Sequence, residues 1–372
     1  MEWIRDDRPR RIKLISTGGT IASRWQGTGY AADASGDDVL ATAARPEGIE
    51  VEVVDLFNVN SSRMTTARQL TLLRAVHEAL ADPGVDGIVV THGTDTLEES
   101  AFFLDLHHSD PRPVVFTGAQ RPLGTGDGDG PGNVYDALQV AASVRELGVL
   151  VVFDGVVHAA RGTVKAQTLA AAAFADPSEP SLGKAGFAKV DVRRRPDRPA
   201  PLPLPQAAVD GNDGPFPRVD IVTHHSDGDP LLLNAAVAAG ARGVVLVGTG
   251  AGNATPEIAE AVAEAVAQGV VVALSTRVHS GPVAEMYTGG GAVDLVAAGA
   301  VLAGTLRAGQ ARMALLATLL SDVAPARRDT LLRDLLNGPT RAEPALAAGG
   351  SGSRFSGTHA SAAVVRKHAV LH

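Results

Sequence analysis

Residues 88–100 read Ile-Val-Val-Thr-His-Gly-Thr-Asp-Thr-Leu-Glu-Glu-Ser, and this stretch decides the fold. The apolar run at its start predicts a buried strand at residues 87–90, and the acidic residues in its second half mark the first turn of a helix. Residues 91–95 should form the turn between them, where open α/β sheets bind their ligands. An ordinary capped turn is the alternative, because Thr and Asp are favoured helix caps. Two pairs of residues match the capping-box pattern: Thr96 with Glu99, and Asp95 with Glu98.

Length and charge narrow the class of protein. The 372 residues exceed one typical core and predict two domains. Lys plus Arg is 33 and Asp plus Glu is 41, so the formal charge is 33 − 41 = −8, which argues against nucleic acid as a partner. The N-terminus lacks the apolar segment of a signal peptide, and no apolar run reaches the ~20 residues that span a bilayer. We therefore expect a cytoplasmic protein with no membrane partner.

Cysteine and histidine bear on metal and redox chemistry. The chain has no cysteine, which excludes disulfides, thiolate catalysis and cysteine-ligated metals. The histidine pairs at residues 107–108 and 224–225 lack carboxylate partners at metal-ligand spacing, so no metal site is predicted.

Strands and helices alternate along the chain, which predicts an α/β fold. We expect a larger N-terminal, mostly parallel sheet with flanking helices and a smaller C-terminal α/β domain. The expected regions are an N-terminal catalytic domain at 1–195, an extended proline-rich linker at 196–217, the smaller domain at 218–336 and a C-terminal extension at 337–372. Predicted strands are 11–16, 50–55, 87–90, 113–117, 148–153, 219–223, 243–247 and 270–274, and predicted helices include 67–80, 231–239, 256–268, 308–320 and 327–336.

A polar stretch at residues 23–38 follows the first strand and contains Trp25 and Tyr30. A long polar loop in this place is often a mobile lid over a site. A plain surface loop is the alternative interpretation.

Three turns carry side chains suited to acyl transfer, provided that their strands lie side by side. Thr20 follows two glycines after the first strand, and a hydroxyl becomes a nucleophile once a base takes its proton. Lys165 is a candidate base if desolvation lowers its pKa, and Thr94 could pass the proton between the two. Backbone N–H groups around Thr94 and Ala119 could stabilise an oxyanion, and Asp95 could hold a substrate ammonium group.

The same residues also have structural interpretations. The turn at Thr20 could bind phosphate, although the chain contains neither a G-x-G-x-x-G nor a Walker A pattern, which disfavours a nucleotide-binding protein. Lys165 could be a solvated surface lysine and Asp95 a helix cap. His92 is expected to be a packed turn residue rather than a base.

Four motifs together resemble the bacterial L-asparaginase/glutaminase family. The first signature, at residues 16–22, reads Ser-Thr-Gly-Gly-Thr-Ile-Ala, and the second, at residues 90–99, reads Val-Thr-His-Gly-Thr-Asp-Thr-Leu-Glu-Glu. Residues 116–122 and 129–133 also resemble the family's pattern, as Phe-Thr-Gly-Ala-Gln-Arg-Pro and Asp-Gly-Pro-Gly-Asn. The likeness covers residues 12–320, and the two signatures together make it specific.

This resemblance implies an amidohydrolase that converts L-asparagine to L-aspartate and ammonia, with glutaminase side activity left open. Such enzymes use no cofactor or metal, and most are tetramers built from intimate dimers, so a homo-oligomer (dimer or tetramer) is expected. The resemblance assigns Thr20 as the nucleophile that forms an acyl-enzyme and Tyr30 as its assistant. Thr94, Asp95 and Lys165 would form the second catalytic cluster.

The resemblance also implies how a small amide would bind. Ser61 falls where the family binds the substrate α-carboxylate, and Asn253 matches a residue that reaches a neighbouring subunit's site. Ser62 stands where many members have glutamine, and Glu285 is the nearest candidate for the acidic residue that a partner subunit usually contributes. These departures leave the choice between asparagine and glutamine open. They also motivate the alternative of a catalytically silent amino-acid-binding protein. The implied substrate-binding set is Ser61, Ser62, Thr94, Asp95, Ala119 and Asn253.

Overall fold

A computed structural model describes residues 8–186, 189–211 and 214–338. The expected C-terminal extension at 337–372 lies outside the described residues from residue 339 onward. No helix in the described ranges is long and apolar enough to cross a membrane.

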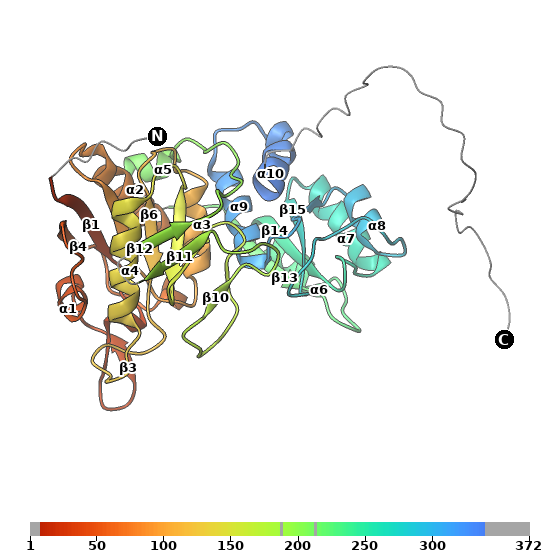
Figure 1. The fold of residues 1–372 in the computed structure, drawn as a ribbon. Helices are drawn as coiled ribbons and strands as arrows, with labels where there is room; N and C mark the ends of the chain where they lie inside the picture. The colour runs from red at the N-terminus through yellow and green to blue at the C-terminus, as the bar shows by residue number, and fades with distance from the viewer. Residues whose placement is uncertain (1–7, 187–188, 212–213, 339–372) are drawn as a thin grey trace, which may run out of the picture. The chain divides into compact units, whose positions relative to one another are not determined.

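The N-terminal part is built on an eight-stranded sheet with the order β12-β11-β8-β7-β6-β5-β1-β4 (Figure 1). Strands β4, β1, β5, β6 and β7 run parallel to one another, and β8, β11 and β12 extend the sheet beyond β7 in antiparallel pairs. The Asp154-Gly155 turn, with φ of 49° and 71°, joins β7 to β8 as a tight hairpin. The predicted mostly parallel sheet is therefore confirmed. The strands are β1 (Arg10–Ser16), β4 (Ile49–Asp55), β5 (Gly87–Thr91), β6 (Val114–Thr117), β7 (Val149–Phe153), β8 (Val156–Ala159), β11 (Gly183–Gly186) and β12 (Lys189–Val192).

Helices cover both faces of this sheet, because successive strand residues point to opposite faces and both are apolar. Ile15 and Val90 face the core shared with α2 and α3, whereas Leu14 and Val89 face the core shared with α1 and α4. These helices are α1 (Gly36–Thr42), α2 (Thr66–Ala81), α3 (Leu97–Asp105) and α4 (Gly130–Ser143).

The smaller C-terminal part has a parallel four-stranded sheet, ordered β13-β14-β15-β16. Helix α9 (Ala308–Leu320) packs against this sheet and also against α3 of the N-terminal part (Figure 1). The predicted α9 boundaries are confirmed. The other elements are β13 (Arg218–Thr223), β14 (Ala241–Gly248), β15 (Val271–Thr276), β16 (Val301–Leu302), α6 (Leu231–Ala238), α7 (Pro256–Ala267), α8 (Ala292–Ala297) and α10 (Arg328–Asn337).

Two segments predicted as irregular contain regular structure. The polar stretch at 23–38 forms a hairpin of β2 (Ser23–Trp25) and β3 (Tyr30–Ala32), and the start of α1 follows. The proline-rich segment at 196–217 is not simply extended, because α5 (Gln206–Asp210) interrupts it. The Leu202 N–H also donates to the Leu106 carbonyl, 2.7 Å away, which fixes this segment to the N-terminal part.

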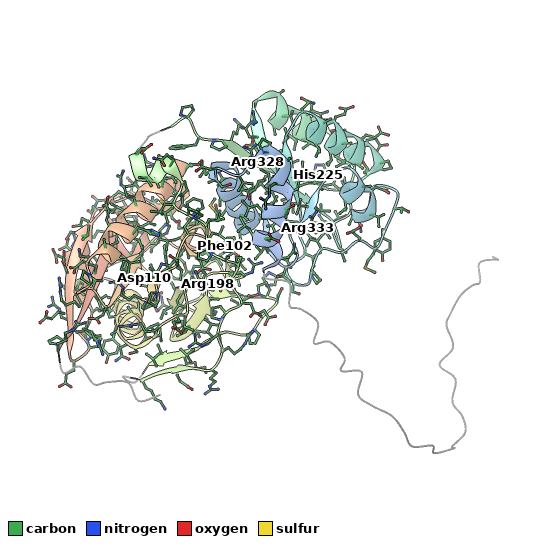
Figure 2. The ribbon with its side chains drawn as sticks, turned by 90° about the horizontal axis from the view of Figure 1, so that it is seen from above. Phe102, Asp110, Arg198, His225, Arg328 and Arg333 are labelled. Carbon is green, nitrogen blue, oxygen red and sulfur yellow. The ribbon has the colours of Figure 1, made fainter. Side chains whose placement is uncertain are left out.

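Two arginines of the N-terminal part contact buried side chains. The guanidinium of Arg198 lies 2.8 Å from the buried carboxylate of Asp105, and the guanidinium carbon of Arg161 lies 5.8 Å from the ring centroid of Phe102. Figure 2 shows Phe102 and Arg198 among the side chains of the N-terminal part, and Arg333 on α10.

Candidate active site

A pocket lies beyond the carboxyl ends of three neighbouring strands. The ends align because Ser16 of β1 pairs with Thr91 of β5, which pairs with Thr117 of β6. The lining residues are Gly19, Thr20, Ser23, Tyr30, Asn60, Ser61, Ser62, Gly93, Thr94, Asp95, Gln120 and Pro122. All the predicted site residues except Lys165, Ala119 and Asn253 therefore lie around one pocket.

The turn that carries Thr20 packs directly against the turn that carries Thr94. Gly18 and Gly19 have φ of 94° and 88°, a region that favours glycine. A Cβ placed on Gly19 would lie 2.2 Å from the Gly93 Cα, which is far inside contact distance. The missing side chain therefore permits the close approach of the two turns.

Lys165 contacts two of the pocket-lining residues from the short strand β9 (Val164–Lys165), which pairs with β10 (Phe174–Ala175). Its Nζ donates to the Thr94 Oγ1 and to the Asp95 Oδ1, both at 2.9 Å. The Lys165 side chain is about four-fifths buried, at 19% exposure, so its position is fixed by these contacts rather than by solvent. The alternative of a solvated surface lysine does not fit this geometry.

Gln120 is a pocket residue that the sequence analysis did not single out. The Thr94 hydroxyl donates to its Oε1 at 3.2 Å, and its Nε2 donates to the carbonyls of Thr168 and Ala170 at 3.1 and 3.2 Å. The Asp129 carboxylate accepts the Gln120 backbone N–H at 2.9 Å. The signals available in the sequence were its place three residues after β6 and within the motif at residues 116–122.

Ala119 has no place in the lining of the pocket. Its side chain is buried at 1% exposure in the core shared with α1 and α4. Any role for this residue would belong to its backbone, as the sequence analysis expected.

The two predicted capping boxes are absent, so this prediction was wrong. Thr96 is the N-cap of α3, but its side chain makes no capping bond and its hydroxyl donates to the Ser61 carbonyl at 2.8 Å. The Glu98 carboxylate accepts the backbone N–H of Lys165 instead of a capping N–H. The side chains of Thr96 and Glu98 hydrogen-bond to residues far away along the chain, so they are not available to cap the helix.

Ser61 and Ser62 differ in their surroundings. The Ser61 hydroxyl is 96% buried and accepts the Asp95 backbone N–H at 3.1 Å, so it orients the turn as well as lining the pocket. Ser62 is exposed at the pocket wall.

His92 is the packed residue that the sequence analysis expected. Its ring is fully buried, with Nδ1 2.8 Å from the Gly93 carbonyl and Nε2 2.9 Å from the Ser100 hydroxyl. Burial lowers the pKa of His92 to about 4, so the ring is neutral at physiological pH. The His92 side chain stabilises the turn through these two hydrogen bonds.

Tyr30 and Asn253 occupy different places. Tyr30 is about half exposed on the hairpin, where its ring lies edge-on to Trp25 with centroids 5.2 Å apart, and it lines the pocket. Asn253 follows β14 and pairs with Thr249, outside the pocket lining. Glu285 is exposed on a C-terminal loop. Over the described ranges, no group of three or more His, Cys, Asp or Glu side chains could hold a metal ion.

Known proteins are similar to this one in sequence over most of the chain. Residues 11–198 match the family described as Asparaginase, N-terminal, and residues 218–331 match the Glutaminase/Asparaginase C-terminal domain. An L-asparaginase of Bacillus licheniformis is 35% identical over 84% of this chain and 96% of its own length. A probable L-asparaginase of Deinococcus radiodurans is 38% identical over 86% of this chain and 95% of its own.

The fold also matches a solved structure. The crystal structure of a probable cytoplasmic L-asparaginase from Campylobacter jejuni superimposes with a TM-score of 0.77 at 28% identity, covering 87% of this chain and 99% of that one. Both halves of the chain therefore match both halves of the same enzymes, and the chain belongs to the asparaginase family.

Proposed function

We propose that this protein is an L-asparagine amidohydrolase that releases L-aspartate and ammonia through a threonine acyl-enzyme. The observation that carries the proposal is the position of Lys165, which contacts Thr94 and Asp95 at the rim of the pocket that Thr20 also lines. The relatives named L-asparaginase support the choice of substrate.

The proposed reaction begins with attack of the Thr20 Oγ on the carbonyl carbon of the side-chain amide. The proton of this hydroxyl passes through the Thr94 Oγ1 toward the Nζ of Lys165, which we propose as the base. Collapse of the tetrahedral intermediate breaks the C–N bond, and the nitrogen leaves as ammonia with the proton that Lys165 had accepted. Water then attacks the ester carbonyl and the ester bond breaks. The oxygen of the water stays in the aspartate carboxyl group, and one of its protons restores the Thr20 hydroxyl.

Substrate recognition would use the groups at the pocket wall. We propose that Asp95 holds the substrate ammonium group and that Ser61 lies beside the α-carboxylate, with Ser62 completing this wall. Tyr30 on the hairpin would approach Thr20 when substrate is bound. Asp95 is the only carboxylate among the pocket-lining residues within the described ranges, so a second anion for the ammonium group would come from another subunit.

The remaining proposals concern the assembly and the cell. We propose a homo-oligomer, dimer or tetramer, in which Asn253 lies toward the site of a neighbouring subunit. A cytoplasmic location is also proposed, supported by the description of the Campylobacter jejuni relative as cytoplasmic. The catalytic groups would all come from the proposed N-terminal domain at residues 1–195.

An ammonia assay with L-asparagine, D-asparagine and L-glutamine tests this proposal. We expect release from L-asparagine, slower or absent release from the other two, and loss of roughly a thousand-fold or more in Thr20→Ala. Unchanged turnover in Thr20→Ala would show that the nucleophile is wrong. Tight binding of aspartate by calorimetry without ammonia release from any substrate would instead favour a silent amino-acid-binding protein.

A further inference from the structure

Lys165 is held at both ends by one short segment. Its Nζ contacts Thr94 and Asp95, and its backbone N–H donates to the carboxylate of Glu98 in the first turn of α3. The location of the Lys165 main chain is thus fixed relative to the same turn that its Nζ must reach. The conformation of the residues just before Lys165 decides whether both contacts can form together.

Those preceding residues are fixed by Gln310, a fully buried side chain on α9. The Gln310 Oε1 accepts the Gly162 N–H at 2.8 Å. Its Nε2 donates to the carbonyls of Ala160 and Thr163 at 2.8 and 2.9 Å. One carboxamide therefore satisfies three backbone groups of the turn that leads into Lys165, and the amide comes from a helix that packs on the C-terminal sheet.

Helix α9 also lies close to Glu98. A Cβ placed on Gly309 would lie 3.4 Å from the Glu98 Oε1 and 3.2 Å from the Glu99 Oε1. Arg312, one turn further along α9, places its Nη1 3.8 Å from the Glu99 carboxylate. The first turn of α3 and the turn before Lys165 therefore both contact the N-terminal part of α9, at residues 309–312.

We propose that Gln310 is a positioning residue for Lys165, which it acts on through the backbone of residues 160–163. The inference rests on the proposed function, because it assumes that the Nζ of Lys165 takes part in the reaction. A glutamine is suited to this task because its planar amide offers both a donor and an acceptor to buried backbone groups. Loss of either would release the turn and let the Nζ move away from Thr94, without touching Ser61 or the pocket wall.

Two substitutions and one control test this role. Gln310→Met keeps the length of the side chain and removes all its hydrogen bonds, whereas Gln310→Glu keeps the acceptor for Gly162 and loses the donors. Gln139→Met is the matched control, because Gln139 is also a buried glutamine on a helix but bonds only Tyr135, with its Oε1 unpartnered. The kcat and KM for ammonia release are measured at a temperature where circular dichroism shows every variant folded.

We expect kcat to fall roughly 10- to 100-fold in Gln310→Met, with KM near the wild-type value, because misplacement of about 1 Å costs rates of this size. Gln310→Glu should fall at least as far as Gln310→Met, because an ionised carboxylate keeps the acceptor for Gly162 but turns its second oxygen toward the carbonyls of Ala160 and Thr163. Gln139→Met should keep both constants. Wild-type kcat in a folded Gln310→Met overturns the inference. An equal loss in Gln139→Met also overturns it, because the effect would then belong to any buried glutamine.

Hydrogen exchange separates this inference from the proposed function. The amides of Gly162 and Lys165 should exchange faster in Gln310→Met, and in Gln310→Glu if the methionine variant does not fold. Exchange equal to wild type at both amides refutes the positioning role whatever the activity. If wild type itself releases no ammonia from any substrate, the proposed function fails, and faster exchange would still establish that Gln310 holds this turn.

Discussion

Adding one methyl group at Gly19 tests the close approach of the two catalytic turns. The Cβ of Gly19→Ala would lie 2.2 Å from the Gly93 Cα, whereas ordinary contact begins at 3.4 Å, so the turns must separate by 3.4 − 2.2 = 1.2 Å. Overpacking of this kind costs about 1–3 kcal/mol, and an alanine at φ 88° adds about 1–3 kcal/mol of backbone strain. We expect a loss of roughly 2–6 kcal/mol in the free energy of unfolding.

The activity should fall further than the stability alone explains. A displacement of about 1 Å between Thr20 and Thr94 is expected to lower kcat roughly 100-fold in the protein that remains folded. The assays are urea unfolding and ammonia release from L-asparagine at a temperature where the variant is folded.

Gly240→Ala is the control for this experiment. Gly240 has φ 87°, nearly that of Gly19, but a Cβ there meets nothing within 4 Å. The Gly240→Ala variant should therefore show the backbone strain of an alanine at positive φ, without any displacement of the two catalytic turns, and keep wild-type kcat. If Gly19→Ala matches Gly240→Ala in both stability and kcat, the two turns are not in the tight contact described, and the reasoning is refuted.

Lys165→Met should lower kcat about 10²- to 10⁴-fold while calorimetry still detects aspartate binding; wild-type turnover would remove the lysine from the mechanism. Arg198→Met should lower the urea-measured free energy of unfolding by about 3–5 kcal/mol, because it leaves the Asp105 carboxylate buried without its cation; a change below about 1 kcal/mol would contradict this. Burial lowers the pKa of His92, His107, His108 and His158 to about 4 from an ordinary value of 6.5, so between these values the unfolded chain binds more protons at these four sites, which destabilises the fold in acid. Burial raises the pKa of Glu98 to about 7, which works in the opposite sense over the same range. The thermal midpoint of Glu98→Gln should therefore drop more than that of wild type as pH falls from 6.5 toward 4, and an equal or smaller drop would contradict the linkage.

The elements that follow from local patterns were predictable from the sequence. The apolar run before Thr91 gave a strand, the acidic residues after Asp95 gave a helix start, and strand–helix alternation gave the sheet. The parallel order of the strands then brings the turns at Thr20 and Thr94 to one edge. Within this regular frame, short-range rules were sufficient.

Other features depend on contacts between distant segments and could not be read locally. Thr96 and Glu98 look like capping residues, but Ser61 and Lys165, far away along the chain, compete successfully for their polar groups. Gln310 carries no signal at all, because a glutamine within an apolar helix becomes informative only when the backbone groups it meets are known.

The hairpin at residues 23–32 shows a second kind of limit. Its strands are three residues each, too short for a periodic pattern, and the ring contact between Trp25 and Tyr30 depends on the register of the pairing. Helix α5 within the proline-rich segment is equally short and has no capping side chain. Helix α5 is stabilised by packing of Ala208 in the core, whereas the hairpin is held by its strand pairing and by the ring contact.

Rapid quenching of the wild-type protein during turnover of L-asparagine, followed by mass spectrometry of its peptides, tests the central claim most directly. An aspartyl ester on the peptide that contains Thr20, formed as fast as ammonia is released and absent from Thr20→Ala, is the predicted result. Full ammonia release with no adduct on that peptide at any quench time, and with turnover preserved in Thr20→Ala, would contradict it.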